Sequence, residues 1–233
     1  MQYKRSAHCK TCDTCNQKSP LFNMLNSAEL EVLNTDRFEV VFNPGENIIK
    51  QGTAASHLVS LTSGIAKIYL EGMDRKNIIL DLIRPWRIFG SPGIFTDMRY
   101  HYSVASLTET SACFIPVENF KKIFRMNPDF AEGFLKSWSN ITAKNYERLI
   151  SLTQKQMPGR IADVLLYLSN HVYHGEQFNL NITRQEIGEF SNMTKESATR
   201  ILKDFENEGI IKIEGKSITI QKNEVLKDIA LRG

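Results

Sequence analysis

The sequence predicts an α+β fold, in which an antiparallel β-roll, or jelly roll, precedes one long helix and a small domain of helices and a hairpin. Short alternating apolar runs between turn residues fill residues 38–114, as expected of a roll. One helical pattern covers residues 129–156, and two short helical patterns lead into paired strands between residues 181 and 220. With 233 residues, 42% of them apolar, the chain can bury two modest cores.

The first part of the chain is predicted to hold an irregular arm and a sensor domain. Residues 1–20 are polar and lack periodicity, so we expect a cysteine-containing arm there. A short capped helix at residues 27–33 leads into the roll, and a second helix, Val117 to Met126, closes a domain that spans residues 21–128. Turn signals separate the strand-length runs at Asn43-Pro-Gly45, Gln51-Gly52, Ser63-Gly64, Glu71-Gly72 and Arg84-Pro85.

An apolar seam near heptad spacing runs along the long helix, which we expect to form a separate segment, residues 129–157. The seam consists of Phe134, Leu135, Trp138, Ile141, Asn145, Leu149 and Leu152. Four turns of apolar surface on an otherwise polar helix need a partner, either the protein's own roll or a second chain. Pro158-Gly159 then predicts a hinge, and an amphipathic helix from Arg160 to Tyr173 begins the last domain, residues 158–233.

Residues 181–209 predict two short helices joined by a tight turn, which is the geometry of a helix-turn-helix. Thr183 and Glu186 can form a capping box for the first helix, and Thr194 can cap the second. One stripe of the second helix is predicted to be buried: Ala198, Ile201, Leu202 and Phe205. Gly209 ends this helix, and the β-hairpin pattern that follows makes the motif a winged helix.

The exposed face of the second helix has side chains that suit a DNA major groove. Arg200 can donate two hydrogen bonds to guanine, Glu196 can accept one from a cytosine amine, and Thr199 can contact a base edge or a thymine methyl. The DNA-binding residues that we predict are Thr183, Thr194, Lys195, Glu196, Ser197, Thr199, Arg200 and Lys203. The alternative is an ordinary amphipathic helix pair with a solvated face. Because the net charge is only +3 and the chain from Lys155 onward is neutral, the DNA prediction rests on the pattern of residues.

These motifs resemble the cyclic-AMP receptor protein and fumarate-nitrate reductase regulator (CRP/FNR) family of bacterial transcription factors. The resemblance is carried by Ile182-Thr-Arg-Gln-Glu-Ile-Gly188, Glu196-Ser-Ala-Thr-Arg200, Gly215-Lys-Ser-Ile-Thr-Ile220 and, upstream, Asn43-Pro-Gly-Glu-Asn-Ile-Ile-Lys-Gln-Gly52. It implies that the roll is a cyclic-nucleotide-binding-like domain. It also implies that the seam of the long helix is the dimer interface of a homodimer, in which Asn145 fixes the register. A palindromic double-stranded DNA site and contacts with RNA polymerase are further implications.

The family's nucleotide pocket is only partly matched. In the family a Gly-Glu pair holds the ribose and an Arg-Ser pair holds the cyclic phosphate, and the matching effector-pocket positions here are Gly90, Ser91, Tyr102 and Ser103. The acid and the arginine are missing, so neither the ribose acceptor nor the charged phosphate clamp is present. A cyclic nucleotide is therefore disfavoured, although Arg99 and His101 could supply a cation by another route.

Four cysteines offer a different sensor. Cys9, Cys12 and Cys15 are each separated by two residues, and Cys113 lies just before an Ile-Pro pair. Closely spaced thiolates can bind one metal ion or one cluster. The set resembles the oxygen-sensing branch of the family, whose [4Fe–4S] cluster uses three N-terminal cysteines and a remote one. The position of Cys15 differs from that branch, in which more than two residues usually separate the second and third cysteines.

Other interpretations of the cysteines stay open. Zinc suits four thiolates equally well on spacing alone. The thiols can also be free of metal, with Cys113 as a small buried residue or with thiol redox chemistry as the function. Haem is the weakest alternative, because no motif singles out one of the histidines.

Several classes of protein are disfavoured by the sequence. No apolar run approaches the ~20 residues of a membrane span, and no secretion signal is evident, so we expect a cytoplasmic protein. No catalytic motif is present, which argues against an enzyme. The sequence thus predicts a homodimeric, sequence-specific DNA-binding transcription regulator whose roll or cysteine arm senses a redox, gas or small-molecule signal. The alternative is a metal- or redox-handling protein whose winged helix mediates protein contacts.

Overall fold

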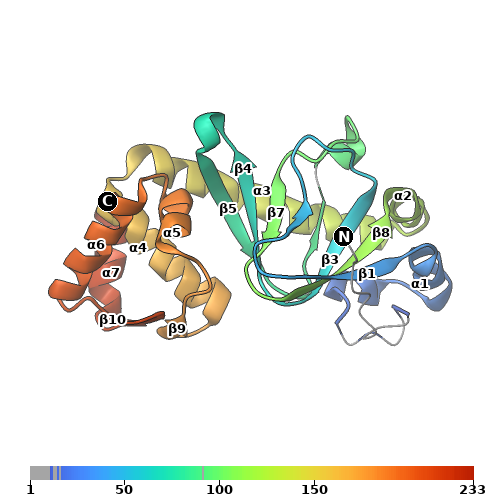
Figure 1. Cartoon of the computed structure of the whole chain (residues 1–233). Coiled ribbons are helices and arrows are strands. Elements are labelled where there is room, and N and C mark those ends of the chain that lie inside the picture. The colour runs from blue at the N-terminus through green and yellow to red at the C-terminus, as the bar shows by residue number, and fades with distance from the viewer. Residues whose placement is uncertain (1–10, 13–14, 16, 91) are drawn as a thin grey trace. The chain divides into compact units, whose positions relative to one another are not determined.

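The computed structural model describes residues 11–12, 15, 17–90 and 92–233 (Figure 1). The chain forms two compact units. The first unit consists of Met1–Glu71 with Asp81–Ile141, and the second consists of Gly72–Leu80 with Thr142–Gly233. Each unit has its own hydrophobic core.

Eight strands form two four-stranded sheets with antiparallel pairing, which confirms the predicted roll. One sheet has the strand order β1-β8-β3-β6 and the other has β2-β7-β4-β5. The strands are β1 (Phe38–Phe42), β2 (Asn47–Ile49), β3 (His57–Ser63), β4 (Ala66–Glu71), β5 (Asn77–Ile83), β6 (Ile88–Phe89), β7 (Ser103–Ser106) and β8 (Thr110–Pro116). Three 3-10 turns accompany them: η1 (Pro20–Met24), η2 (Met73–Arg75) and η3 (Pro92–Phe95). β1 and β2 are therefore edge strands of different sheets.

The pairing register gives the first sheet two chemically different faces. Phe38 pairs with Phe114 on β8, so these two rings share one face. Glu39 pairs with Cys113, and Cys113 pairs with Ser60 on β3, so these three side chains share the opposite face. The same pair of strands thus carries aromatic rings on one side and a polar row with a thiol on the other.

Two helices complete the first unit. α1 (Ser27–Asn34) and α2 (Val117–Met126) contact each other, and both contact β8. α1 begins where the sequence predicts, after Asn26, whose side chain accepts a hydrogen bond from the N–H of Glu29 in a capping box. α2 has the predicted bounds.

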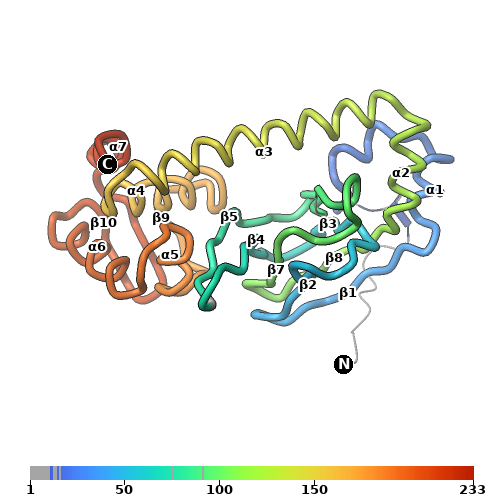
Figure 2. Tube along the Cα trace, turned by 90° about the horizontal axis from the view of Figure 1, so that it is seen from above, coloured from blue at the N-terminus to red at the C-terminus, as the bar shows by residue number. Residues whose placement is uncertain are grey.

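The predicted long helix is present as α3 (Pro128–Gln154), which has 27 residues. Figure 2 shows it as one continuous helix. Within the described residues, no helix has both the length and the apolar character that a membrane span requires.

The second unit combines helices with a three-stranded sheet. Its helices are α4 (Met157–Tyr167), α5 (Arg184–Ser191), α6 (Lys195–Asn207) and α7 (Asn223–Arg232), with a π-helical turn, η4 (Leu168–Tyr173), after α4. The sheet has the order β10-β11-β9 and consists of β9 (Gln177–Asn179), β10 (Ile211–Glu214) and β11 (Ser217–Ile220). β10 and β11 are the predicted hairpin, whereas β9 and α7 were not predicted. The single helix expected from Arg160 to Tyr173 is instead α4 followed by the π-helical turn.

α4 lies at the centre of the second unit, where it contacts α5, α6 and α7. Its predicted inward face is buried: Ile161, Val164, Leu165 and Leu168. The burial of this stripe gives the helix-turn-helix a fixed support.

Candidate DNA-reading surface and thiol site

The first helix of the helix-turn-helix begins with the predicted capping box. The hydroxyl of Thr183 accepts a hydrogen bond from the N–H of Glu186 at 3.2 Å, and the Glu186 carboxylate accepts one from the N–H of Thr183 at 2.7 Å. Two backbone donors that no helical carbonyl can reach are satisfied in this way. The start of α5 is therefore set by local sequence.

The turn between α5 and α6 depends on a close approach at Gly188. A Cβ atom placed there would lie 2.7 Å from the carbonyl oxygen of Met193, so only glycine fits without a backbone shift. Asn192 takes the left-handed conformation, with a φ of 50°. The hydroxyl of Thr194 then caps α6 by accepting a hydrogen bond from the N–H of Ser197 at 3.2 Å.

α6 has one buried face and one exposed face, as predicted. The buried residues are Ala198, Ile201, Leu202 and Phe205, and the exposed ones are Lys195, Glu196, Thr199, Arg200 and Lys203. Ser197 is half-buried, and within the described residues Glu196 and Arg200 are engaged in no ion pair. The Thr199 hydroxyl donates to the carbonyl of Lys195 at 2.7 Å. Because that hydroxyl is used within the helix, Thr199 offers its methyl group to a partner.

Two arginines that sequence reasoning missed hold the other end of α5. Arg160 on α4 donates to the carbonyls of Ser191 and Asn192 at 3.1 and 3.0 Å. Arg148 on α3 donates to the carbonyl of Phe190, and its guanidinium lies 4.1 Å from the centroid of the Phe190 ring. Cations at a helix C-terminus complement its dipole and satisfy its last carbonyls. No local sequence pattern predicts these contacts, because each joins residues more than 30 positions apart.

The first unit contains a buried thiol site next to an arginine. Cys12, Cys15 and Cys113 are all buried, and Cys9 lies outside the described residues. Arg37 donates a hydrogen bond from Nη1 to the Sγ of Cys113 at 2.9 Å. Burial lowers the pKa of Arg37, but the charges of Cys113, Cys12 and Glu39 outweigh this effect and leave the pKa raised. Burial also raises the pKa of Cys113 to about 12, even though Arg37 opposes the change.

Two orphaned polar atoms flank Cys113. The Oε2 atom of Glu39 and the hydroxyl of Ser60 are buried, and they find no hydrogen-bond partner within the described residues. The other carboxylate oxygen of Glu39 accepts a hydrogen bond from the Thr62 hydroxyl at 2.7 Å. Buried polar atoms without partners are costly, so they favour a further polar or ionic group at this place. Among the described residues, no three His, Cys, Asp or Glu side chains form a group that could hold a metal ion.

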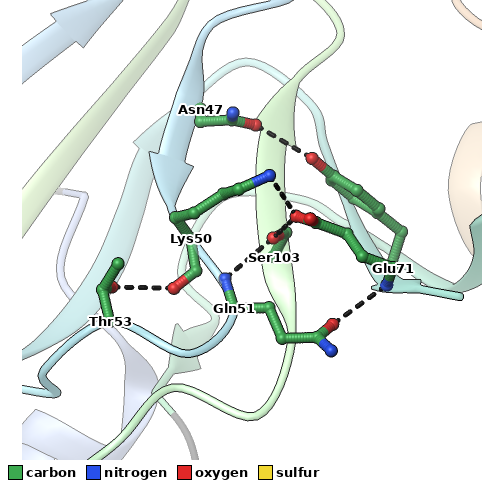
Figure 3. A network of polar contacts seen from close by, with 7 residues as sticks. Asn47, Lys50, Gln51, Thr53, Glu71 and Ser103 are labelled. Carbon is green, nitrogen blue, oxygen red and sulfur yellow. Dashed lines mark hydrogen bonds and ion pairs between the residues drawn. The ribbon is translucent and has the colours of Figure 1, made fainter. Parts of the chain in front are cut away.

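The predicted effector-pocket residues are engaged within the protein. The N–H of Gly90 donates to the Tyr102 hydroxyl at 3.1 Å, and burial raises the pKa of Tyr102 far above its ordinary value. The Ser103 hydroxyl donates to the carboxylate of Glu71 and accepts from the N–H of Gln51 at 2.9 Å (Figure 3). Ser91 lies outside the described residues.

The cations near this region are also engaged. Lys50 forms an ion pair with Glu71 at 2.5 Å, and Figure 3 shows this pair beside Ser103. Arg99 donates to the carbonyl of Gly52 at 2.8 Å, and His101 contacts Asp97 at 3.0 Å. The charged groups that the sequence offered for an alternative phosphate clamp therefore already have protein partners.

The predicted seam of α3 divides into two parts. Phe134 is buried and packs against Phe120, with ring centroids 5.0 Å apart, so little of its surface is left for the predicted interface. Trp138, Ile141 and Leu152 are half-buried, and Asn145 is exposed. Leu135 and Leu149 are exposed as an interface requires, and so are two residues outside the predicted seam, Tyr146 and Ile150.

Family models match both units of the chain. The cyclic nucleotide-binding domain model matches residues 39–127, and the Crp-like helix-turn-helix domain model matches residues 159–229. The first match covers most of the roll, and the second covers the whole helix-turn-helix with its hairpin.

Relatives align along nearly the whole chain. The transcriptional activator protein FnrA of Stutzerimonas stutzeri is 26% identical over 93% of this chain and 90% of its own length. The fumarate and nitrate reduction regulatory protein of Escherichia coli (strain K12) is 26% identical over 96% of this chain and 90% of its own length. Both are similar to this chain from the roll to the winged helix.

Solved structures share the fold. FixK2 from Bradyrhizobium japonicum has a TM-score of 0.76 at 18% identity and covers 83% of this chain and 96% of its own. A crp/fnr-family regulator from Eubacterium rectale has a TM-score of 0.75 at 20% identity and covers 91% of this chain and 98% of its own.

The curated relatives are transcription regulators and not enzymes, and this chain is a transcription regulator with a helix-turn-helix DNA-binding domain. The two family models, the full-length relatives and the shared fold agree that this chain belongs to the CRP/FNR family of transcription regulators.

Proposed function

We propose that the protein acts as a homodimer that reads a palindromic duplex with two copies of α6, and that the thiol site adjusts its DNA affinity. The observation that carries the proposal is the exposed row formed by Glu196, Thr199 and Arg200 on a helix whose other face is completely buried. A recognition helix needs such side chains free and its support rigid. We expect the protein to work in the cytoplasm, where it can reach DNA and RNA polymerase.

Each exposed side chain has a defined role in this proposal. Arg200 donates two hydrogen bonds to a guanine, Glu196 accepts one from a cytosine amine, and the Thr199 methyl contacts a thymine methyl. Lys195 and Lys203 contact phosphates, which adds affinity without sequence preference. The capped helix starts that contain Thr183, Thr194 and Ser197 lie where backbone N–H groups favour phosphate.

The exposed apolar residues of α3 support the proposal of a dimer. Leu135, Tyr146, Leu149 and Ile150 are between 53% and 65% exposed, which is unusual for four large apolar side chains on one helix. We propose that the same helix of a second copy covers them. Such a homodimer has two α6 helices, as a palindromic site with half-sites one turn of DNA apart requires.

We propose that Cys9, Cys12, Cys15 and Cys113 hold a [4Fe–4S] cluster. Two observations support this proposal: three of the thiols are buried, and Cys12 and Cys113 both lie close enough to Arg37 to affect its pKa. A cluster on four thiolates is anionic, and Arg37 supplies a positive charge at Cys113. When bound, such a cluster supplies a one-electron centre that oxygen can destroy. We further propose that residues 1–20 and 21–128 sense, residues 129–157 dimerise and residues 158–233 bind DNA.

The cofactor proposal is tested by analysis of protein purified without oxygen. We expect about four iron and four sulfide per chain with a brown absorption band, and loss of both in the Cys113→Ser variant. Stoichiometric zinc, or a colourless protein free of metal, would overturn the cluster and leave the DNA proposal intact. A cyclic nucleotide is not expected to change DNA affinity, because Tyr102 and Ser103 are already bonded within the protein.

The DNA proposal is tested by selecting binding sites from a pool of randomised duplexes. We expect a palindrome whose preference at one symmetric G·C pair disappears in the Arg200→Ala variant, at a cost of about 1–3 kcal/mol. Lys203→Ala is the matched control, because it should weaken binding to all sequences alike. If no duplex is bound in a salt-dependent manner, a redox-handling protein with a protein-binding winged helix becomes the better explanation.

A further inference from the structure

A cavity of about 500 Å³ opens in the roll between the edge strands β1 and β2. Its aromatic lining residues are Phe38, Phe42, His57, Tyr100 and Phe114. None of Gly90, Tyr102 and Ser103 lines it, so it is distinct from the family's nucleotide pocket. Its volume is in the range of small-molecule sites.

Aromatic rings in contact with one another form one wall of the cavity. Phe38 and Phe114 stack in parallel, with ring centroids 5.0 Å apart and an interplanar angle of 0°. The His57 ring lies edge-on to Phe38 at 5.2 Å and to Phe114 at 6.1 Å. Phe38 is 39% exposed, so part of a ring face is open to an incoming molecule. Parallel and edge-on contacts of this kind favour aromatic ligands.

His57 is the polar group that can fix the orientation of a ligand. Its Nδ1 atom contacts the Ser56 hydroxyl at 2.8 Å, and its carbonyl accepts from the Tyr100 hydroxyl at 2.6 Å. Its Nε2 atom has no partner within the described residues. Burial lowers the pKa of His57, so the imidazole is uncharged near neutral pH.

Most of the other polar side chains of the lining are already engaged, whereas the Oε2 atom of Glu39, which also belongs to the lining, has no partner within the described residues. Asn47 accepts from the Tyr69 hydroxyl at 3.0 Å, and Thr53 donates to the carbonyl of Lys50 at 2.7 Å. Lys50 itself is paired with Glu71. No free cation is therefore offered to a carboxylate or a phosphate, and the unpartnered oxygen of Glu39 adds a hydrogen-bond acceptor, so the cavity disfavours an anion and suits an uncharged molecule with a hydroxyl donor.

We propose that this cavity binds an uncharged hydroxylated aromatic molecule of one or two fused rings. A hydroxyl can both donate and accept, so it can pair with the Nε2 atom of His57 in either tautomer. The rings would lie against Phe38 and Phe114, on the face of β1 and β8 opposite Cys113.

The test compares 2-naphthol with naphthalene, which differs only by the missing hydroxyl. Binding to the full chain is measured by isothermal titration for the wild type, His57→Phe and Phe95→Ala. We expect the wild type to bind 2-naphthol about 3- to 10-fold more tightly than naphthalene, the gain of one hydrogen bond. His57→Phe keeps an aromatic ring without a nitrogen, so the two affinities should become equal. Phe95, which is 48% exposed and outside the cavity, is the control and should behave as wild type.

Two results would overturn the proposal. One is the absence of saturable 2-naphthol binding to the wild type. The other is a preference for 2-naphthol over naphthalene that persists unchanged in His57→Phe. Should that variant fold poorly, Phe38→Ala provides a second test at an exposed position, where both probes are expected to bind at least about fivefold more weakly.

Discussion

Arg148 contacts Phe190 in two ways. Its guanidinium lies 4.1 Å from the centroid of the Phe190 ring, and it donates a hydrogen bond to the carbonyl of the same residue. The same guanidinium donates to the carbonyl of Ile79 at 2.5 Å. Arg148 belongs to α3 and Phe190 to the last turn of α5. One side chain thus connects the long helix directly to the helix-turn-helix. We expect a movement of α3 at Arg148 to change the position of α5.

Replacing Arg148 by Met is expected to destabilise the second unit. The change keeps much of the side-chain length but leaves the carbonyls of two buried residues, Ile79 and Phe190, without their donor, at a cost of about 1–3 kcal/mol in the free energy of unfolding. Urea unfolding followed by circular dichroism measures the loss. Lys144→Met, an exposed cation on the same helix, is the matched control. Equal stability of the two variants would show that the contacts of Arg148 contribute nothing to the free energy of unfolding.

Thr199 is expected to recognise a thymine methyl through its own methyl group. Its hydroxyl is bonded to the Lys195 carbonyl, so Thr199→Val should keep DNA affinity and Thr199→Ser should lose about 0.8 kcal/mol, roughly fourfold. Fluorescence anisotropy with duplexes that carry thymine or uracil at each position isolates the methyl. The preference for thymine should vanish in Thr199→Ser alone. A preference that survives in Thr199→Ser and disappears in Thr199→Val would assign the contact to the hydroxyl.

Local signals in the sequence were sufficient for the parts of the fold that local chemistry decides. The capping box of Thr183 and Glu186, the cap at Thr194 and the positive φ of Gly209 all act within a few residues, and all were predictable. β9 was not, because a strand of three residues has little periodicity and depends on pairing with β11. Its existence is decided by tertiary structure.

The candidate sites show the same division. The exposed row of α6 could be predicted, since helical periodicity alone separates its two faces. The contact between Arg37 and Cys113 could not, because it joins residues 76 positions apart. The sequence showed that Ser91 and Tyr102 differ from the nucleotide-binding pattern, but not that Tyr102 bonds to Gly90. Likewise, periodicity placed Phe134 on the seam without showing that Phe120 already covers it.

A charge introduced into the exposed stripe of α3 is expected to dissociate the dimer. Leu149→Glu would bury an unpaired carboxylate between two helices, and it should raise the dimer dissociation constant by at least about 100-fold. Sedimentation velocity measures this change. Lys144→Glu introduces the same side chain on the same helix outside the stripe, so it should remain dimeric. A Leu149→Glu protein that stays dimeric would place the interface elsewhere.

Arg37 is expected to raise the reduction potential of a cluster bound at the thiol site. Reduction adds negative charge next to the guanidinium, so removing the cation disfavours the reduced state. Arg37→Met should lower the midpoint potential by on the order of 50 mV. Spectroelectrochemistry of the anaerobic protein gives the value, and Arg125→Met, an exposed arginine on α2, is the control. An unchanged potential would mean that Arg37 serves packing alone.

Acid is expected to destabilise the roll through His57. Burial lowers the pKa of His57 in the folded protein, so below about pH 6.5 the unfolded chain binds a proton there before the folded chain does. The unfolded state then holds more protons, and the free energy of unfolding falls as the pH drops from 7 towards 5. His57→Gln cannot titrate and should show a shallower fall, whereas the exposed His171→Gln should follow the wild type. Identical slopes for His57→Gln and the wild type would mean that the imidazole has the same pKa in the folded and the unfolded chain. That result would also contradict an uncharged His57 in the lining of the cavity.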